Sequence, residues 1–287
     1  MAENTKISWA THTFNPWIGC TKVGPPCDGC YAEELDKRYW GGVHWGAGAP
    51  RKRTAPGNWR QPLKWERQAV AAGTRPRVFC ASLADWADNE VPDEWRVDLA
   101  ALILTTPHLD WLLLTKRIGN AAKMLPAMFP QGVPANVWAG ITVADQAEAD
   151  RDVWRLLQLK QQLGITIAFL SIEPMLGPID LRRLSTLHFR GAEVLNALTG
   201  RLSGMFGGFC PTTLPALDLI FVGGESGRNP RHMPLSWPRA LLEQTRGTGC
   251  AFHMKQLSQA DYPKNYRTFD LFPADLRVRE LPAGVAA

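Results

Sequence analysis

Three cysteines lie close together near the start of the chain, in the stretch GCTKVGPPCDGCYAEE. They are Cys20, Cys27 and Cys30, half of the six cysteines in the sequence, and their spacing is C-x6-C-x2-C. Such a loop supplies three soft thiolate ligands and leaves a fourth position, either of a tetrahedral ion or of a [4Fe-4S] cluster, without a protein ligand. An open position of this kind can bind a substrate or a cofactor.

A zinc ion is the alternative occupant of this loop. A structural zinc site normally closes with a fourth protein ligand, for which His12 and His44 are the nearest candidates. Thiols without any metal are the third interpretation. The other cysteines, Cys80, Cys210 and Cys250, are expected to be small buried side chains.

The N-terminal stretch MAENTKISWATHTF has no basic region followed by an apolar run, and no window of the chain approaches the roughly 18 apolar residues that span a bilayer. We therefore expect a cytoplasmic protein without a membrane partner. In a reducing cytosol, clustered cysteines more readily bind metal or do redox chemistry than form disulfides.

The chain that positions these cysteines has the composition of a globular protein. Its 287 residues are 45% hydrophobic and 21% charged, and α/β barrels of this length are routinely single units. We expect one domain over residues 1–287. The net charge of +5 is compatible with a polyanionic partner but does not require one.

From residue 78 onward, short apolar runs alternate with segments of helical period, which predicts repeated βα units and a parallel sheet. The near-continuous apolarity of the runs fits strands that are buried on both faces. The predicted strands cover residues 78–83, 111–115, 137–143, 167–172, 219–224 and 251–256, and another ends near Phe14. Helices are predicted over 31–39, around the apolar stripe of Trp95, Leu99, Leu102 and Ile103, over 145–163, and from Ser236 to near Gly247.

About seven parallel strands predict an incomplete (β/α) barrel, with a doubly wound sheet as the alternative. Residues 178–216 interrupt the alternation with mixed polar, Gly and Pro content. We expect them to form an insertion within the domain.

Polar side chains follow nearly every predicted strand, where the loops of a parallel α/β fold gather its ligand site. Lys116, Glu173, Glu225 and Lys255 directly follow or close apolar runs, where a charge without a partner is costly. Gly223 and Gly224 would let a ligand approach the backbone closely. The other candidates at these ends are Ser82, Asp85, Thr115, Arg117, Thr142, Ser171, Ser226 and Gln256.

A basic, tryptophan-containing stretch, PRKRTAPGNWRQPLKWERQ, covers residues 50–68. Basic groups neutralise phosphates and indoles stack on bases, so a nucleotide or nucleic acid is a candidate substrate or partner. A solvated loop followed by an amphipathic helix is the alternative interpretation. The basic members are Arg51, Lys52, Arg53, Arg60, Lys64 and Arg67, and the tryptophans are Trp59 and Trp65.

Several stretches together resemble a family. They are SWATHTFNPWIGCTKVGPPCDGCYAEE, LLLTKR, LSIEPMLGPIDL, VGGESGRNPRHMP and FHMKQ, in this order over roughly residues 6–285. The chain is similar to phage and bacterial proteins of uncertain function whose three-cysteine motif is akin to that of radical S-adenosylmethionine (SAM) enzymes.

The resemblance implies a radical-SAM-like barrel in which Cys20, Cys27 and Cys30 bind three irons of a [4Fe-4S] cluster. The fourth iron would take the methionine part of SAM, and reduction would cleave SAM to methionine and a 5′-deoxyadenosyl radical, for use on an unidentified substrate. The motif departs from the usual radical SAM pattern in its longer first gap and in Gly29, which stands where an aromatic residue is common. Tyr31 is expected to supply the stacking face instead.

By the same resemblance, Ser82, Ser171, Glu173 and Glu225 are expected to contact the amino, carboxylate or ribose groups of SAM. Lys116 and Lys255 are expected to face anionic groups, and with Glu173 and Glu225 they form the candidate catalytic set. Tyr31, Thr142, Gly223, Gly224 and Ser226 complete the candidate cofactor-binding set. Two alternative functions are a zinc-stabilised nucleic-acid-binding protein without catalysis and an iron-sulfur protein that transfers electrons. A second protein is a further candidate partner.

Overall fold

The computed structural model describes residues 3–186, 193–204 and 209–285. Its internal contacts divide the chain into two compact units, Met1–Gly140 and Ile141–Val285, and each is described here by itself. The single domain expected over residues 1–287 stays a prediction.

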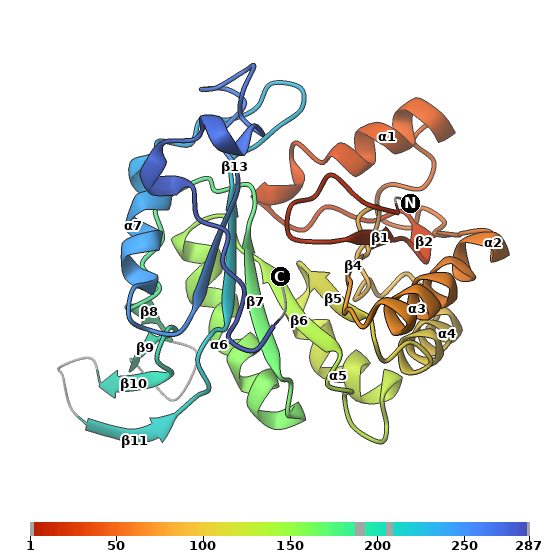
Figure 1. The fold of residues 1–287 in the computed structure, drawn as a ribbon, viewed down its shortest axis with the longest axis horizontal. Coiled ribbons are helices and arrows are strands. Elements are labelled where there is room, and N and C mark those ends of the chain that lie inside the picture. The colour runs from red at the N-terminus through yellow and green to blue at the C-terminus, as the bar shows by residue number, and fades with distance from the viewer. Residues whose placement is uncertain (1–2, 187–192, 205–208, 286–287) are drawn as a thin grey trace. The chain divides into compact units, whose positions relative to one another are not determined.

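Seven strands form one sheet in the order β1-β4-β5-β6-β7-β12-β13 (Figure 1). The pairs β1 with β4, β4 with β5, β7 with β12 and β12 with β13 are all parallel. In the described part of the chain, no pairing joins the end strands β1 and β13, so the sheet is open and the predicted incomplete (β/α) barrel is confirmed. The strands are β1 (His12–Phe14), β4 (Arg77–Cys80), β5 (Asp110–Thr115), β6 (Val137–Thr142), β7 (Ile167–Ile172), β12 (Leu219–Gly223) and β13 (Ala251–Gln256).

Helices alternate with these strands along the chain (Figure 1). The first unit contains α1 (Tyr31–Trp40), α2 (Pro56–Trp59), α3 (Gln61–Ala72), α4 (Asp93–Leu104) and α5 (Ile118–Met128), and the second contains α6 (Gln146–Leu163) and α7 (Ser236–Thr245). Three short 3-10 helices are η1 (Pro25–Cys27), η2 (Phe269–Leu271) and η3 (Ala274–Leu276). The four predicted helices correspond to α1, α4, α6 and α7.

The strands form because their apolar runs are buried on both faces. In β5, Trp111, Leu112 and Leu113 are each fully buried, as the continuous run predicts. The predicted stripe of α4 is buried at Leu99, Leu102 and Ile103. Cys80 and Cys250 are buried as expected, whereas the side chain of Cys210 lies outside the described residues.

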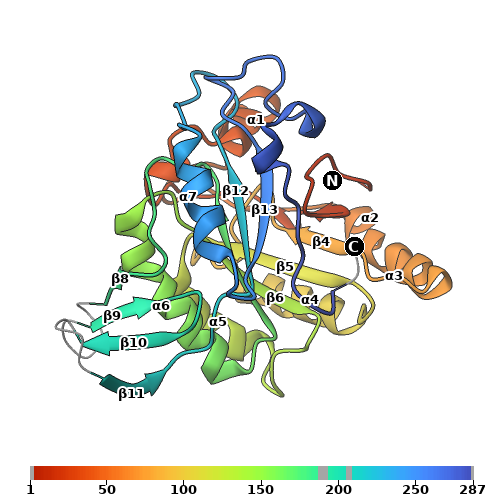
Figure 2. The ribbon, with the colours of Figure 1, turned by 60° about the vertical axis from the view of Figure 1, so that its left-hand side comes forward.

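The predicted insertion, residues 178–216, contains a four-stranded antiparallel sheet in the order β11-β10-β9-β8 (Figure 2). Gly200 is required in the turn after β9, because its φ is +71° and a Cβ atom there would lie 1.8 Å from the Leu214 carbonyl oxygen. Residues 187–192 and 205–208 of this segment lie outside the described part. The strands are β8 (Leu184–Ser185), β9 (Glu193–Asn196), β10 (Arg201–Gly204) and β11 (Phe209–Thr213).

A last pair of short strands, β2 (Trp17–Ile18) and β3 (Lys52–Arg53), is antiparallel and lies in the first unit. Among the helices that the structure describes, none is long and apolar enough to cross a lipid bilayer.

Helix α6 shows how local sequence sets an element boundary. Oδ1 of Asp145 accepts the Glu148 backbone N–H at 2.9 Å, and the Glu148 carboxylate accepts the Ala144 N–H at 2.9 Å. The helix ends at Gly164, whose φ of +64° is the left-handed conformation of a C-terminal cap. The helix predicted over 145–163 is therefore confirmed, and Asp145 and Gly164 set its two ends.

We predict that Asp145→Ala lowers the free energy of unfolding by about 1 kcal/mol, because a helix N–H loses its acceptor. Asp145→Ser keeps an acceptor and is expected to stay within a few tenths of a kcal/mol of the unsubstituted protein. Urea unfolding followed by circular dichroism measures both. Equal losses in the two variants would show that the cap does not stabilise α6.

Candidate functional site

The cysteine loop, residues 19–30, is fixed by three short elements of the first unit. Cys20 follows β2 after one residue, Gly19, and forms a parallel β-bridge with Trp45. Cys27 is the last residue of η1 and is buried. Cys30 is the N-cap of α1, with φ −66° and ψ 111°. Each sulfur is therefore carried by a differently anchored piece of backbone.

Gly19 fixes the path of the chain into Cys20. Its φ is +112°, a conformation that side-chain-bearing residues rarely adopt. A Cβ atom there would lie 2.5 Å from the carbonyl oxygen of His44 and 3.0 Å from Cδ of Arg51. Only glycine permits this close packing of the segment before Cys20 against the loop after α1.

The guanidinium of Arg117, at the start of α5, contacts the first cysteine. Its Nη1 donates to Sγ of Cys20 at 3.4 Å and to Oδ2 of Asp85 at 3.2 Å, and its Nη2 donates to the carbonyl oxygen of Thr21 at 2.7 Å. The Arg117 side chain is only 10% exposed. A buried positive charge therefore lies beside this thiol.

Asp85, which follows β4, orients Arg117. Its Oδ1 accepts the Thr115 hydroxyl at 2.7 Å and the Ala87 N–H at 3.0 Å, and its Oδ2 accepts the Lys116 N–H at 2.9 Å. The carboxylate is thus held on both oxygens by donors from its own loop and from the end of β5, as a buried charge requires.

A second arginine holds the other side of Thr21. Arg51 is fully buried and donates from Nε to Asp88 at 2.9 Å and from Nη2 to the Thr21 hydroxyl at 2.8 Å. Its Nη1 donates to the Ala49 carbonyl at 2.8 Å. We call Arg51, Arg117, Asp85 and Asp88 the arginine–aspartate network, because together they enclose Thr21 next to Cys20.

Burial dominates the electrostatics of the thiols. It raises the pKa of Cys20 to about 11, with the Asp85 charge acting in the same direction and Arg117 acting against it. Burial also raises the pKa of Cys30, against the backbone N–H of Glu33 and the positive charge of Lys116. Both thiols are therefore protonated at neutral pH in the metal-free protein, and metal binding would release their protons.

Tyr31 and Ser82 are brought together, but not as free ligand contacts. The Tyr31 hydroxyl donates to the Ser82 carbonyl oxygen at 2.6 Å, which ties the start of α1 to the loop after β4. The Ser82 hydroxyl is 3.0 Å from Nδ2 of Asn15, and Oδ1 of Asn15 accepts the Leu83 N–H at 2.7 Å. Whether Tyr31 and Ser82 contact SAM stays a prediction.

In the described residues, no three or more His, Cys, Asp and Glu side chains are grouped as ligands of one metal ion. The two histidines proposed to close a zinc site have other neighbours: His12 stacks on Trp65 at 4.2 Å, and Nδ1 of His44 lies 2.7 Å from Oδ1 of Asp36. A four-iron cluster binds each thiolate to a different iron, so it does not need three sulfurs around one ion. The donor set, three free thiols of one loop, fits such a cluster chemically.

The second unit holds another group of predicted residues, at the ends of β7 and β13. Oε2 of Glu173 lies 3.1 Å from Nζ of Lys255 and accepts the Ser171 hydroxyl at 3.3 Å. Among the described residues, Oε1 of Glu173 is buried and has no hydrogen-bond partner. The hydroxyl of Thr142, at the end of β6, is also buried without a partner in that part of the chain. Unpaired buried polar atoms of this kind are costly unless a ligand or water satisfies them.

Gly223, the last residue of β12, leaves space for the Glu173 carboxylate. A Cβ atom at Gly223 would lie 2.9 Å from Oε1 of Glu173 and 3.2 Å from Cγ of Gln256. The lack of a side chain at Gly223 therefore positions this carboxylate.

The remaining predicted residues of the second unit have structural partners. Oε2 of Glu225 accepts the backbone N–H and Nε of Arg231 at 2.9 and 2.8 Å. Ser226 accepts Nη2 of Arg267 at 3.2 Å. At Gly224 a Cβ atom would lie 2.4 Å from Cα of Ser258, so close backbone packing explains this glycine.

The basic stretch 50–68 is only partly available to a ligand. Besides the buried Arg51, Trp65 is 1% exposed, and Lys64 pairs with Glu3 at 3.0 Å. Arg53 pairs with Asp98 at 2.6 Å. Interior packing and ion pairs thus use much of this stretch.

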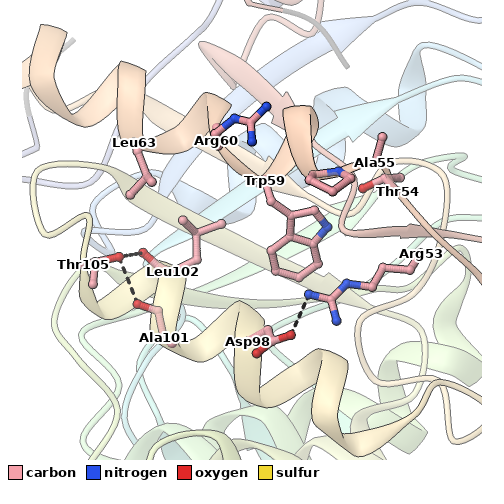
Figure 3. A pocket seen from close by; sticks show the side chains of 11 residues that line it. Arg53, Thr54, Ala55, Trp59, Arg60, Leu63, Asp98, Ala101, Leu102 and Thr105 are labelled. Atoms are coloured by element: carbon pink, nitrogen blue, oxygen red, sulfur yellow. Dashed lines mark hydrogen bonds and ion pairs between the residues drawn. The ribbon is translucent and has the colours of Figure 1, made fainter.

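A groove lies beside this stretch. It has a volume of about 830 Å³ and runs between β3, α2 and α3 on one side and α4 on the other (Figure 3). Figure 3 shows Trp59 at its centre, and Arg53 lies over that ring with Cζ 4.5 Å from the ring centroid. Arg60, on the rim, has no ion pair among the described residues.

Sequence reasoning missed the residues that hold the candidate sites in place. Asn15, Arg51, Asp88 and Arg231 were not identified as anchors, although an Asn-Pro pair after the first strand and an aspartate near the candidate Asp85 were visible signals. Asn15 bonds to Leu83 and Arg51 bonds to Asp88, and both partners lie far away in the sequence. Only the fold reveals these contacts.

We predict that Glu225→Gln lowers the free energy of unfolding at pH 7 by about 1 to 2 kcal/mol, because Arg231 loses its charged partner. Burial acts to raise the pKa of Glu225, but the side-chain and backbone donors of Arg231 outweigh it and the pKa is lowered. The stabilisation is therefore present above the ordinary glutamate pKa of about 4.3 and is lost as the pH falls through the lower folded-state value.

Urea unfolding at a series of pH values tests this, and the stabilities of the two proteins should converge as the pH falls through the lowered folded-state pKa of Glu225. The control Glu243→Gln removes an exposed ion pair with Arg246 and should leave the stability unchanged. A stability difference between Glu225→Gln and the unsubstituted protein that does not depend on pH would contradict the ionic origin of the effect.

Comparison with known proteins gives a family and no further relatives. No curated protein and no solved structure matches the chain. The sequence model of one family, described as protein of unknown function DUF5131, matches residues 4–269. The chain therefore belongs to the DUF5131 family.

Proposed function

We propose that the protein is a radical SAM-type enzyme in which Cys20, Cys27 and Cys30 hold a [4Fe-4S] cluster. When bound, the cluster would supply the electron that cleaves SAM reductively. The observation that carries the proposal is the cysteine loop itself: three free thiols on separately anchored backbone, with the buried Arg117 against one of them.

The charges around the loop support ligation by thiolates. A buried thiolate is unfavourable by itself, as the raised pKa of Cys20 indicates. Arg117 and Lys116 act against this effect at Cys20 and Cys30 respectively, so each lowers the cost of forming the thiolate beside it.

The Glu173 group supports binding of the polar part of SAM. Oε1 of Glu173 can accept a hydrogen bond from an ammonium or hydroxyl group, and Lys255 can pair with a carboxylate. The hydroxyl of Thr142, which has no partner in the part of the chain that the structure describes, can donate or accept. In this proposal, Glu173 and Lys255 orient the ligand, while Glu225 has a structural role in the loop closed by Arg231.

We propose a nucleotide or nucleic acid as the substrate class. Support comes from the groove of Figure 3, where Arg53 and Arg60 can contact phosphate and Trp59 adds aromatic surface. Asp98 pairs with Arg53 and reduces the positive charge of the groove, so Arg60 is the cation best placed to take a phosphate.

Anaerobic reconstitution with iron and sulfide tests the proposal. We expect about four irons and four sulfides per chain, and 5′-deoxyadenosine after addition of SAM and dithionite. Cys30→Ala should lose the cluster, whereas Cys250→Ala, which removes a free cysteine outside the loop, should keep it. Bound zinc without sulfide would instead support a zinc-stabilised protein, and an intact cluster that never cleaves SAM would support electron transfer.

We predict that Gly223→Ala weakens SAM binding by about tenfold or more, because the added methyl displaces the Glu173 carboxylate and one charge-assisted hydrogen bond of about 1.5 kcal/mol is lost. Gly119→Ala is the control, since a Cβ atom there meets no atom of the described residues within 4 Å. Equilibrium dialysis of the reconstituted proteins measures the affinity. Equal affinities would exclude Glu173 from the SAM site.

A further inference from the structure

We propose that Arg117 is a positioning residue that donates to the Cys20 sulfur and raises the reduction potential of the cluster held by the cysteine loop. This inference rests on the proposed function, because the proposed function requires the cluster on which Arg117 would act. It concerns only residues of the first unit.

The contacts of Arg117 leave its guanidinium one orientation. Nη2 is fixed on the Thr21 carbonyl at 2.7 Å, and Nη1 is shared between Asp85 at 3.2 Å and the Cys20 sulfur at 3.4 Å. Because the guanidinium is planar, fixing one nitrogen and sharing the other sets the direction in which the group faces the sulfur.

Asp85 makes this orientation rigid. Its two oxygens also accept the Thr115 hydroxyl, the Ala87 N–H and the Lys116 N–H, at 2.7 to 3.0 Å. The carboxylate is only 7% exposed in its side chain. The end of β5 and the loop after β4 therefore hold Asp85, and Asp85 holds Arg117.

Anchoring the loop does not by itself explain Arg117, because Arg51 already anchors it. Arg51 bonds to the Thr21 hydroxyl and to Asp88, and its Nη1 reaches the carbonyls of Ala49 and Gly46 at 2.8 and 3.2 Å. Within the described residues, Arg117 donates a hydrogen bond to a cysteine sulfur of the loop, whereas Arg51 does not.

A buried donor at a ligand sulfur changes the electronic balance of a cluster. Reduction adds negative charge, and a nearby positive N–H donor stabilises the reduced form more than the oxidised form. The interaction is strong here because the Arg117 side chain is largely shielded from water. Removal of Arg117 should therefore shift the potential to more negative values.

The test is a redox titration of the reconstituted cluster, monitored by electron paramagnetic resonance, with iron and sulfide content measured on the same samples. We expect Arg117→Gln to keep the cluster, since Arg51 still holds Thr21, and to show a more negative potential. Arg117→Lys keeps one charge without the forked geometry and should shift less in the same direction. Arg239→Gln, which removes an exposed ion pair with Asp275, should match the unsubstituted protein.

An unchanged potential in cluster-bearing Arg117→Gln overturns the inference. If Arg117→Gln fails to fold, Arg117→Lys decides, and a potential equal to that of the unsubstituted protein then overturns it. Folded variants that both lose the cluster would assign Arg117 to loop anchoring alone and also overturn it. An unsubstituted chain that takes up no iron and sulfide contradicts the proposed function itself, which separates the two failures.

Discussion

The first unit depends on how the two arginines beside Thr21 are neutralised. Arg51 and Arg117 lie on either side of Thr21, and Asp88 and Asp85 compensate their charges. Removing one partner of a buried ion pair leaves an uncompensated charge, which is far more destabilising than the pair is stabilising. Each arginine is therefore matched by an aspartate, and the network ties the cysteine loop to the loop after β4 and to the end of β5.

The second unit uses a different constraint at its group of polar residues. Gly223 leaves room for Glu173, which pairs with Lys255, and within the described residues one oxygen of this carboxylate has no hydrogen-bond partner. The neighbouring Glu225, by contrast, is saturated by Arg231. Two glutamates that look alike in the sequence, each after a buried strand, thus have different capacities for a ligand.

The sequence was sufficient to predict the parallel strands because buried strands carry nearly continuous apolar runs. The observed bounds of β7 and β13 are the predicted ones, residues 167–172 and 251–256. The sequence was insufficient for side-chain partners. Arg51 lies in a stretch of basic residues that was predicted to contact nucleic acid, yet its side chain is fully buried against Asp88. Asp88 lies 37 positions away, so the sequence does not reveal this pairing. Ser82 was predicted as a ligand contact, and its bond to Asn15 depends on the pairing of β1 with β4.

The separate anchoring of the cysteines bears on how this loop can change over evolution. Gly19 and the bridge to Trp45 set the position of the first cysteine, whereas η1 and the start of α1 set the positions of the other two. Thr21 is held by the arginine–aspartate network, so only residues 22–24, between Thr21 and η1, are a spacer. Adding residues to a surface spacer costs little free energy. Relatives of this chain can therefore differ in the length of that segment while keeping the three sulfurs where they are.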